Sequence, residues 1–520
     1  MKTENVSRSV LAAGVGAVFA ATALLYAPDL APGLFGGGPQ RPPGPADRAV
    51  LAANAGAQAS LPDLAALIGD REKWLKDHPA DEESWAVLGT AYAERGARLA
   101  DPAYFPRAEQ ALKRSLEVRP AARGNLDAQL GLGALANARG DWRTARTWGE
   151  AVRKEDPKRW PAYPVLIDAY NGLGDYKAAQ KALATLEELH SGAAVSARTA
   201  QMYRNRGWRE DASVAADNAV AQAEPPADKA AAVARLGDLA WERGEPAEAV
   251  EQYGKALRLV PEHGPSLAGR ARALAALDRT DEAVVDHRAA LTLLPRAEYV
   301  LEAGEFYESL GLDGDARSQY ELLRTRTWVG AEVVLGLFEA DHGDPAAAVR
   351  RLRAEWARGH RSVQVADALG WALFRSGEPK EALEYAKKAT DEGLRSALFS
   401  YHRGEIERAV EAYGPARRHL AEALRINPDF SPLLAPKARE AVKALGDPPD
   451  ELPKELRPEP EPVAEPPRTA KAVKAEARAD AKADGTADGT ADGTADRTAD
   501  AQADSPAPAP RETPEPRQPR

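Results

Sequence analysis

The pattern of apolar and polar positions becomes periodic after Leu61 and remains so to Leu445. The period can be measured from one alanine in each expected unit, which opens a second helix and precedes a bulky residue four places on. The successive gaps are 37, 34, 33, 37, 34, 33, 32, 34 and 34 residues. Drift about 34 is typical of a solenoid built from helix pairs. The alanines are Ala108, Ala145, Ala179, Ala212, Ala249, Ala283, Ala316, Ala348, Ala382 and Ala416.

The repeated unit resembles the tetratricopeptide repeat (TPR), whose pattern is W-x2-L-G-x2-Y, then A-x3-F-x2-A, then P. The first unit matches at Trp85, Leu88, Gly89, Tyr92, Ala108, Leu112 and Pro120. The fifth matches at Leu236, Gly237, Ala249, Tyr253, Ala256 and Pro261. The resemblance implies an all-α fold, a right-handed α-solenoid of about ten TPR-like helix pairs.

The small residues of this pattern have packing reasons. A glycine such as Gly89 or Gly237 allows the first helix to cross the second closely. The turns "ERGEP" (242–246) and "RSGEP" (375–379) use glycine for the bend between helices. A single helix pair cannot bury its apolar face alone, so the ends of the stack need caps. We expect residues 64–79 and 430–446 to provide them.

The joint between the two helices of the first unit is unusually long. Ala108 lies 23 residues after Trp85, whereas the family pattern allows about 16. The seven extra residues fall in "ARLADPAYFP" (97–106). We expect them to lengthen the tip between the helices, either as slack around a packed Phe105 or as a loop that contacts a partner.

The N-terminal segment predicts a membrane anchor. Residues 9–28, "SVLAAGVGAVFAATALLYAP", carry no charge, and about 20 apolar residues can span a bilayer as a helix. Lys2 and Arg8 precede this run against the single acid Glu4, which favours a cytoplasmic N-terminus. A secretory signal removed by cleavage is the alternative. A buried core helix is disfavoured, because a Gly/Pro-rich spacer follows.

The expected organisation has four parts. Residues 1–30 form a cytoplasmic stub and a transmembrane signal anchor, and residues 31–60 form a Gly/Pro/Ala-rich linker. Residues 61–445 form the TPR solenoid with its capping helices. Residues 446–520 form a disordered Pro/Ala/Asp-rich tail, since this composition cannot bury enough apolar surface to offset chain entropy.

Composition narrows the class of function. The chain has 520 residues, no cysteine and a net charge of -10, with 69 basic against 79 acidic residues. Absence of cysteine excludes disulfides, thiol nucleophiles and cysteine-ligated zinc. The acidic balance argues against nucleic-acid binding, which needs clustered Lys and Arg. The eight histidines are scattered over different units, and no catalytic, phosphate-binding or metal-binding motif is present. We therefore expect no enzyme activity, cofactor or metal.

The resemblance implies that the first helices line a concave groove that holds a peptide or protein partner. Carried onto this sequence, the groove residues are Asp168, Asn171, Arg204, Asp238, Trp241, Arg272, Glu305, Trp371, Phe374 and Arg375. Both signs of charge with two tryptophans and a phenylalanine suit a peptide anchored by apolar side chains. A basic clamp for a C-terminal carboxylate is not evident, because Ala86 occupies its first-unit position.

These observations predict a non-enzymatic protein–protein interaction scaffold. It would be held by a single pass in the cytoplasmic membrane, with the bulk of the chain outside the cytoplasm. Two alternatives share the fold: an assembly factor or chaperone for envelope or secreted proteins, and a cytoplasmic regulator that senses a peptide. Secretion after signal cleavage is the alternative localisation.

Overall fold

The computed structural model describes residues 42–446. The chain divides into two units, Met1–Pro448 and Pro449–Arg520, and the described residues all belong to the first. The expected anchor at residues 9–28 and most of the expected tail lie outside them. Within the described range, no helix is long and apolar enough to cross a membrane.

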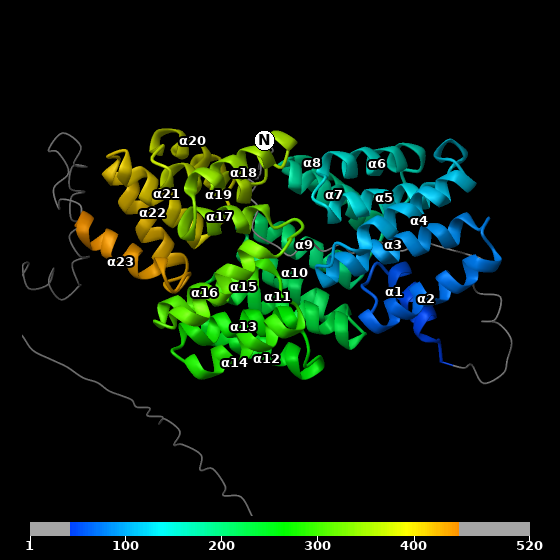
Figure 1. Ribbon diagram of the computed structural model, residues 1–520, viewed down its shortest axis with the longest axis horizontal. Coiled ribbons are helices and arrows are strands. Elements are labelled where there is room, and N and C mark those ends of the chain that lie inside the picture. Colours follow the sequence, from blue (N-terminus) through cyan, green and yellow to red (C-terminus); the bar gives the residue numbers. More distant parts are fainter. Residues whose placement is uncertain (1–41, 447–520) are drawn as a thin grey trace, which may run out of the picture. The chain divides into compact units, whose positions relative to one another are not determined.

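The described residues form 23 α-helices and no strand (Figure 1). The first twelve are α1 Pro45–Asn54, α2 Leu61–Asp77, α3 Glu82–Leu99, α4 Tyr104–Val118, α5 Leu126–Ala138, α6 Trp142–Glu155, α7 Ala162–Leu173, α8 Tyr176–Leu189, α9 Ala193–Asn205, α10 Arg209–Gln222, α11 Pro226–Glu242 and α12 Pro246–Leu259. The others are α13 Gly264–Ala276, α14 Thr280–Leu293, α15 Ala297–Ser309, α16 Asp313–Thr325, α17 Glu332–His342, α18 Pro345–Arg358, α19 Val363–Arg375, α20 Pro379–Thr390, α21 Ala397–Ala409, α22 Tyr413–Ile426 and α23 Leu434–Leu445.

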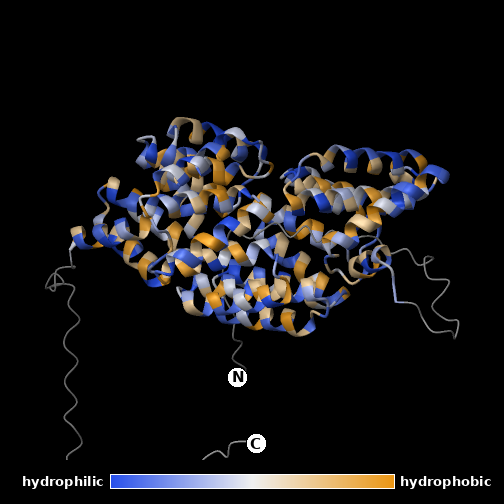
Figure 2. Ribbon diagram, turned by 60° about the horizontal axis from the view of Figure 1, so that its bottom comes forward, coloured by the Kyte–Doolittle hydropathy of each residue, from blue (hydrophilic) through white to orange (hydrophobic). Residues whose placement is uncertain are grey.

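Ten antiparallel helix pairs, from α3/α4 to α21/α22, confirm the predicted repeat. All ten alanines used to measure the period lie in second helices, and each is 0–3% exposed. A Cβ on Gly89 would stand 2.6 Å from Cγ of Leu112, and one on Gly237 would stand 2.7 Å from Cε1 of Tyr253. The close helix crossings expected at these glycines are therefore confirmed. Figure 2 shows apolar residues distributed over every helix pair rather than gathered in one segment.

Helix starts follow from local capping chemistry. Asp81, Asp141 and Asp175 each accept a hydrogen bond from the backbone N–H three residues on, at 3.0–3.2 Å. This arrangement satisfies one of the N–H groups that a helix N-terminus leaves unpaired. Pro246 and Pro379 begin α12 and α20, where a missing N–H is harmless.

Both ends of the stack are capped. At the C-terminal end, α23 buries Ala435, Ala438 and Ala441 against the last pair, as expected. At the N-terminal end, α2 is accompanied by α1, which lies inside the segment expected to be a linker. The helix forms because Pro45 stands at its first position and two alanines on one face, Ala49 and Ala53, pack in the N-terminal core cluster.

The extra residues of the first unit lengthen a helix rather than a loop. Helix α3 runs for 18 residues to Leu99 and ends at Ala100, which has φ +50°. The predicted long tip was wrong because Ala97, Arg98 and Leu99 are good helix formers that continue the helix past Gly96, and the chain turns only at Asp101–Pro102. Phe105 is buried as expected, and the hydroxyl of Tyr104 accepts a hydrogen bond from Arg95.

The added turn of α3 reaches distant units. The side chain of Arg98 donates to the carbonyl of Ala59, and the carbonyl of Ala97 accepts from Arg296, 199 residues away. The extension therefore ties the first unit both to the N-terminal cap and to the loop before α15.

A second set of distant contacts joins the turns of units three to five to the loops that follow units eight to ten; we name this the seam. The N–H of Arg361 donates to the carbonyl of Gly172 at 3.0 Å, and the N–H of Val363 donates to the Tyr176 hydroxyl at 2.9 Å. The Asn427 side chain donates to the carbonyl of Trp241 at 2.8 Å. Helix pairs three to five thus contact the loops after helix pairs eight to ten, and the stack closes on itself.

Candidate partner-binding site on the first helices

The first helices contact one another along one side of the stack. First helices contact each other in two runs, from α3 through α5 to α7 and from α9 through each following first helix to α21. The Asp168–Arg198 ion pair joins α7 to α9. Second helices instead pack mainly on the first helices of their own and the following pair. The first helices therefore share one side of the stack, the side predicted to carry the partner groove.

Polar side chains of neighbouring first helices pair along this side. Asp168 of α7 accepts from Arg198 of α9 at 2.8 Å. Arg204 of α9 donates through Nε to both carboxylate oxygens of Glu242 at the end of α11, at 2.7 and 2.6 Å. Each pair joins one unit to the next, since the partners stand 30 and 38 residues apart.

The pairing continues through the middle of the stack. Arg272 of α13 donates to Glu302 of α15 at 3.1 Å, and its guanidinium stands 5.2 Å from the ring centroid of Trp241 on α11. Further on, Glu305 lies 3.5 Å from a ring nitrogen of His342. Arg272 therefore contacts both neighbouring units, one through charge and one through the face of an aromatic ring.

Toward the C-terminal end, Asp341 of α17 accepts from the indole N–H of Trp371 at 3.0 Å and pairs with Arg375, both on α19. The Trp371 ring stacks on His402 of α21 with 4.1 Å between centroids. His402 bonds in turn to Asp367 at 2.9 Å, and both side chains are at most 2% exposed. Three successive units are thus joined by one connected polar and aromatic cluster.

Burial governs the ionisation of these carboxyls. It raises the pKa of Asp168, although the guanidinium of Arg198 opposes the shift. Burial likewise raises the pKa of Glu302 and Glu305, against the opposing charges of Arg272 and His342. The side chains of Asp168, Glu305 and Glu302 are still 19%, 23% and 32% exposed, so they keep contact with solvent rather than lying in a dry core.

The ten predicted groove residues divide into two kinds. Trp371, Trp241 and Arg204 have only 2%, 8% and 9% exposure, so they mainly join units. The partly exposed side chains are Asp168 at 19%, Glu305 at 23%, Arg272 at 32%, Arg375 at 35% and Asp238 at 37%. Asn171 and Phe374 are half-buried. Partner contact by any of the ten stays a prediction.

The sequence interpretation missed partners of these residues, which include Arg198, Glu242, Glu302, His342, Asp341 and His402. A signal for them was present, because each ion-paired partner stands about one repeat length away on another first helix. Within residues 42–446, no group of three or more His, Asp or Glu side chains is arranged to hold a metal ion.

The buried side chain of His287 in the sixth helix pair predicts that the free energy of unfolding falls in acid. Burial, with a smaller contribution from the Arg272 charge, lowers the pKa of His287 to about 4. Both folded and unfolded chains hold this ring neutral above its ordinary pKa of about 6.5. As the pH falls from about 6.5 to 4, the unfolded chain binds the proton first, so stability falls through that window. At about 1.4 kcal/mol per pKa unit, His287 alone contributes up to about 3 kcal/mol of this loss.

Urea unfolding of wild type and His287→Phe at pH 7.5 and pH 4.5 measures this effect. We expect the variant to lose less stability between the two values. The comparison between variants is needed because burial raises the pKa of Asp228 to about 6, which acts in the opposite direction. Equal losses in both proteins would show that His287 does not titrate in the folded chain as described.

The chain matches no protein-family model and no curated protein. Solved structures similar to it include a TPR protein from Parabacteroides merdae, at 19% identity over 49% of this chain and 99% of that chain, with TM-score 0.31. A thermophilic TPR protein from Thermus thermophilus shares 23% identity over 36% and 98%, with TM-score 0.31. The Cut9–Hcn1 hetero-tetramer of the APC/C shares 13% over 77% and 86%, with TM-score 0.37. The fold assignment rests on the spacing and pairing of this chain's own helices.

Proposed function

The chain is, in its fold, a tetratricopeptide repeat protein, and from that premise we propose that it is a non-enzymatic scaffold that binds protein or peptide partners on its concave side. The observation that supports this function is the row of partly exposed charged side chains on five first helices, α7, α11, α13, α15 and α19. Asp168, Asp238, Arg272, Glu305 and Arg375 belong to five different units. Most of them are held by an ion pair or hydrogen bond to a neighbouring unit.

Such a row suits recognition of an extended partner. Side chains fixed by neighbours lose little rotamer freedom when a partner binds, and less entropy lost means tighter binding. The row carries both signs of charge, and the half-buried Phe374 lies beside Arg375. We infer a partner segment with both acidic and basic groups and an apolar side chain that contacts Phe374.

Crosslinking in cells tests this function. A photoreactive residue placed at Asp238 or Arg375, which are 37% and 35% exposed, should capture a defined partner. Val214 on α10 and Val285 on α14 are 61% and 64% exposed on second helices and serve as controls. Equal labelling from both sets of positions would contradict binding on the concave side.

We further propose that residues 9–28 anchor the chain in the cytoplasmic membrane with the solenoid outside the cytoplasm. The support is a charge-free run of 20 residues preceded by Lys2 and Arg8. Membranes washed with alkaline carbonate should retain the full chain. A reporter enzyme that is active only outside the cytoplasm should be active when fused after Arg520, and a reporter that is active only in the cytoplasm should be inactive there. Recovery of a chain beginning at Met1 in the soluble fraction would contradict the anchor.

A further inference from the structure

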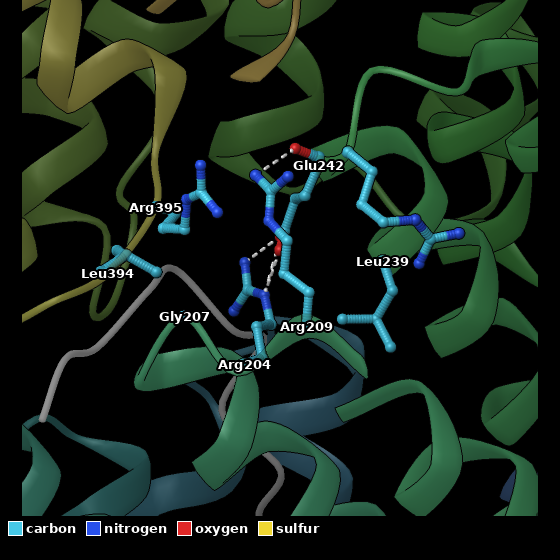
Figure 3. Close-up of a pocket in the computed structure, with 8 residues that line it drawn as sticks. Arg204, Gly207, Arg209, Leu239, Glu242, Leu394 and Arg395 are labelled. Carbon is cyan, nitrogen blue, oxygen red and sulfur yellow. Dashed lines mark hydrogen bonds and ion pairs between the residues drawn. The ribbon is translucent and has the colours of Figure 1, made fainter. Parts of the chain in front are cut away.

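A small hollow opens at the seam, where the α9–α10 turn and the end of α11 face the α20–α21 loop (Figure 3). Its lining is apolar on two sides and cationic elsewhere. The residues that line it are Arg204, Gly207, Arg209, Leu239, Glu242, Arg243, Leu394 and Arg395. Four guanidinium groups therefore surround the hollow with one carboxylate.

Three of these arginines have carboxylate partners. Arg204 pairs with Glu242, Arg243 with Glu245 and Glu248, and Arg395 with Glu422. These contacts balance the charges of Arg204 and Arg243, whereas Arg395 shares Glu422 with Arg425.

Arg209 differs from the other three. It donates to the backbone carbonyl of Glu242 at 3.1 Å, and no carboxylate of the described residues lies within ion-pair distance of it. Burial, and then the charge of Arg395 across the seam, lower the pKa of Arg209. Glu242 and Glu210 attract Arg209 from beyond ion-pair distance and only partly offset Arg395 and burial. A guanidinium held beside another with no carboxylate in direct contact is an unfavourable arrangement that an anion would relieve.

We propose that this hollow binds a small oxyanion group, a phosphate or a carboxylate, between Arg209 and Arg395. The planar guanidinium donors match oxyanion geometry. The hollow holds about 10 Å³, roughly the space of one water-sized sphere. Only one or two ligand oxygens therefore enter it, and the rest of the ligand remains in solvent.

The position of the site gives binding a structural consequence. Arg209 begins α10 in the fourth unit, and Arg395 stands in the loop after the ninth. A Cβ on Gly207 would stand 2.6 Å from the carbonyl oxygen of Gly393, so the two segments touch at this point. An oxyanion held by both arginines would link the two sides of the seam and stabilise the closed stack. Any ligand that binds only the folded state stabilises it by mass action.

Thermal unfolding of the full chain in sodium phosphate or sodium chloride, at equal ionic strength and pH, tests the proposal. We expect phosphate to raise the melting temperature of wild type and the rise to saturate. Arg209→Gln should be no less stable than wild type in chloride, because it removes an uncompensated charge. It should lose the phosphate-dependent rise, and Arg395→Gln should lose the rise as well.

The matched control is Arg350→Gln on α18, whose side chain is 70% exposed and pairs with Asp344. It should keep the full rise. Phosphate also stabilises many proteins by exclusion from their surface, and that effect would be equal in all variants. An equal rise in Arg209→Gln, Arg350→Gln and wild type would therefore overturn the proposal.

Acetate in place of phosphate distinguishes the two sources of the oxyanion. A saturable rise with acetate that Arg209→Gln removes indicates a carboxylate ligand, and a rise with phosphate alone indicates a phosphate ligand. Hydrogen exchange of the peptide around Gly393 supplies a second readout. Exchange there should slow in the effective anion for wild type and not for Arg209→Gln. Absence of any saturable effect with either anion would contradict the site.

Discussion

Replacing Gly174 by alanine is expected to lower the free energy of unfolding by about 2–5 kcal/mol. Gly174 ends α7 with φ +73°, and an alanine in this left-handed conformation costs roughly 1–2 kcal/mol. The added Cβ would also clash with the carbonyl oxygen of Arg361 across the seam. Overpacking of this kind adds about 1–3 kcal/mol. Urea unfolding followed by circular dichroism measures the loss.

Matched controls separate the two contributions. Gly140 and Gly311 occupy equivalent turns with φ of +71° and +72°, and a Cβ there meets no atom within 4 Å. Alanine at either should cost only the roughly 1–2 kcal/mol of backbone strain. A loss at Gly174 no larger than at these two positions would contradict the close approach of Gly174 to Arg361 across the seam.

Tyr253→Ala is expected to cost about 3–5 kcal/mol, as other buried aromatic truncations do. The side chain is fully buried, and its ring fills the space left by Gly237 of α11 and Gly269 of α13. Tyr253 therefore joins the fifth and sixth units, and its loss creates a cavity between them. Chemical unfolding should show a lower midpoint, with earlier hydrogen exchange in α11 and α13 than in distant helices.

Tyr253→Phe is the control for the hydroxyl group, which donates to Asp238 at 2.8 Å. It keeps the ring and should cost only about 0.5–1.5 kcal/mol. If the phenylalanine variant were as unstable as the alanine variant, the hydrogen bond rather than the ring would be the main stabilising contact.

Local features of the fold could be predicted from the sequence because the same residue pattern recurs in ten helix pairs. The position of each key alanine and the crossing at Gly89 depend on residues of the same helix pair. The extent of α3 was not predictable in the same way. Seven residues in excess of the repeat pattern do not show by themselves whether they extend a helix or a loop. Here Ala97, Arg98 and Leu99 are good helix formers, and they extend α3 to contacts with distant units.

The seam was not predictable from local sequence. The turns "ERGEP" and "RSGEP" look equivalent, yet they have different surroundings. A Cβ on Gly244 would lie 3.0 Å from Cα of Asn427, whereas one on Gly377 would meet nothing within 4 Å. The difference arises because closure depends on the summed curvature of five to six units, which no single motif records.

The candidate site was predictable in its positions and only partly in its contacts. The family pattern places the ten groove residues on first helices, where the structure has them. It does not say that Trp371 would be 2% exposed. That burial comes from Asp341 and His402 in neighbouring units, so it depends on pairs between repeats rather than on the repeat itself.

Hydrogen exchange in the loop after α18 tests closure of the stack most directly. The N–H groups of Arg361 and Val363 stand at or before the first turn of α19, where a helix provides them no acceptor. In the closed stack they donate to Gly172 and Tyr176 instead. We expect slow exchange of both amides in wild type, and faster exchange at Val363 in Tyr176→Phe. Exchange of both in wild type at the rate of an open loop would contradict the closed stack.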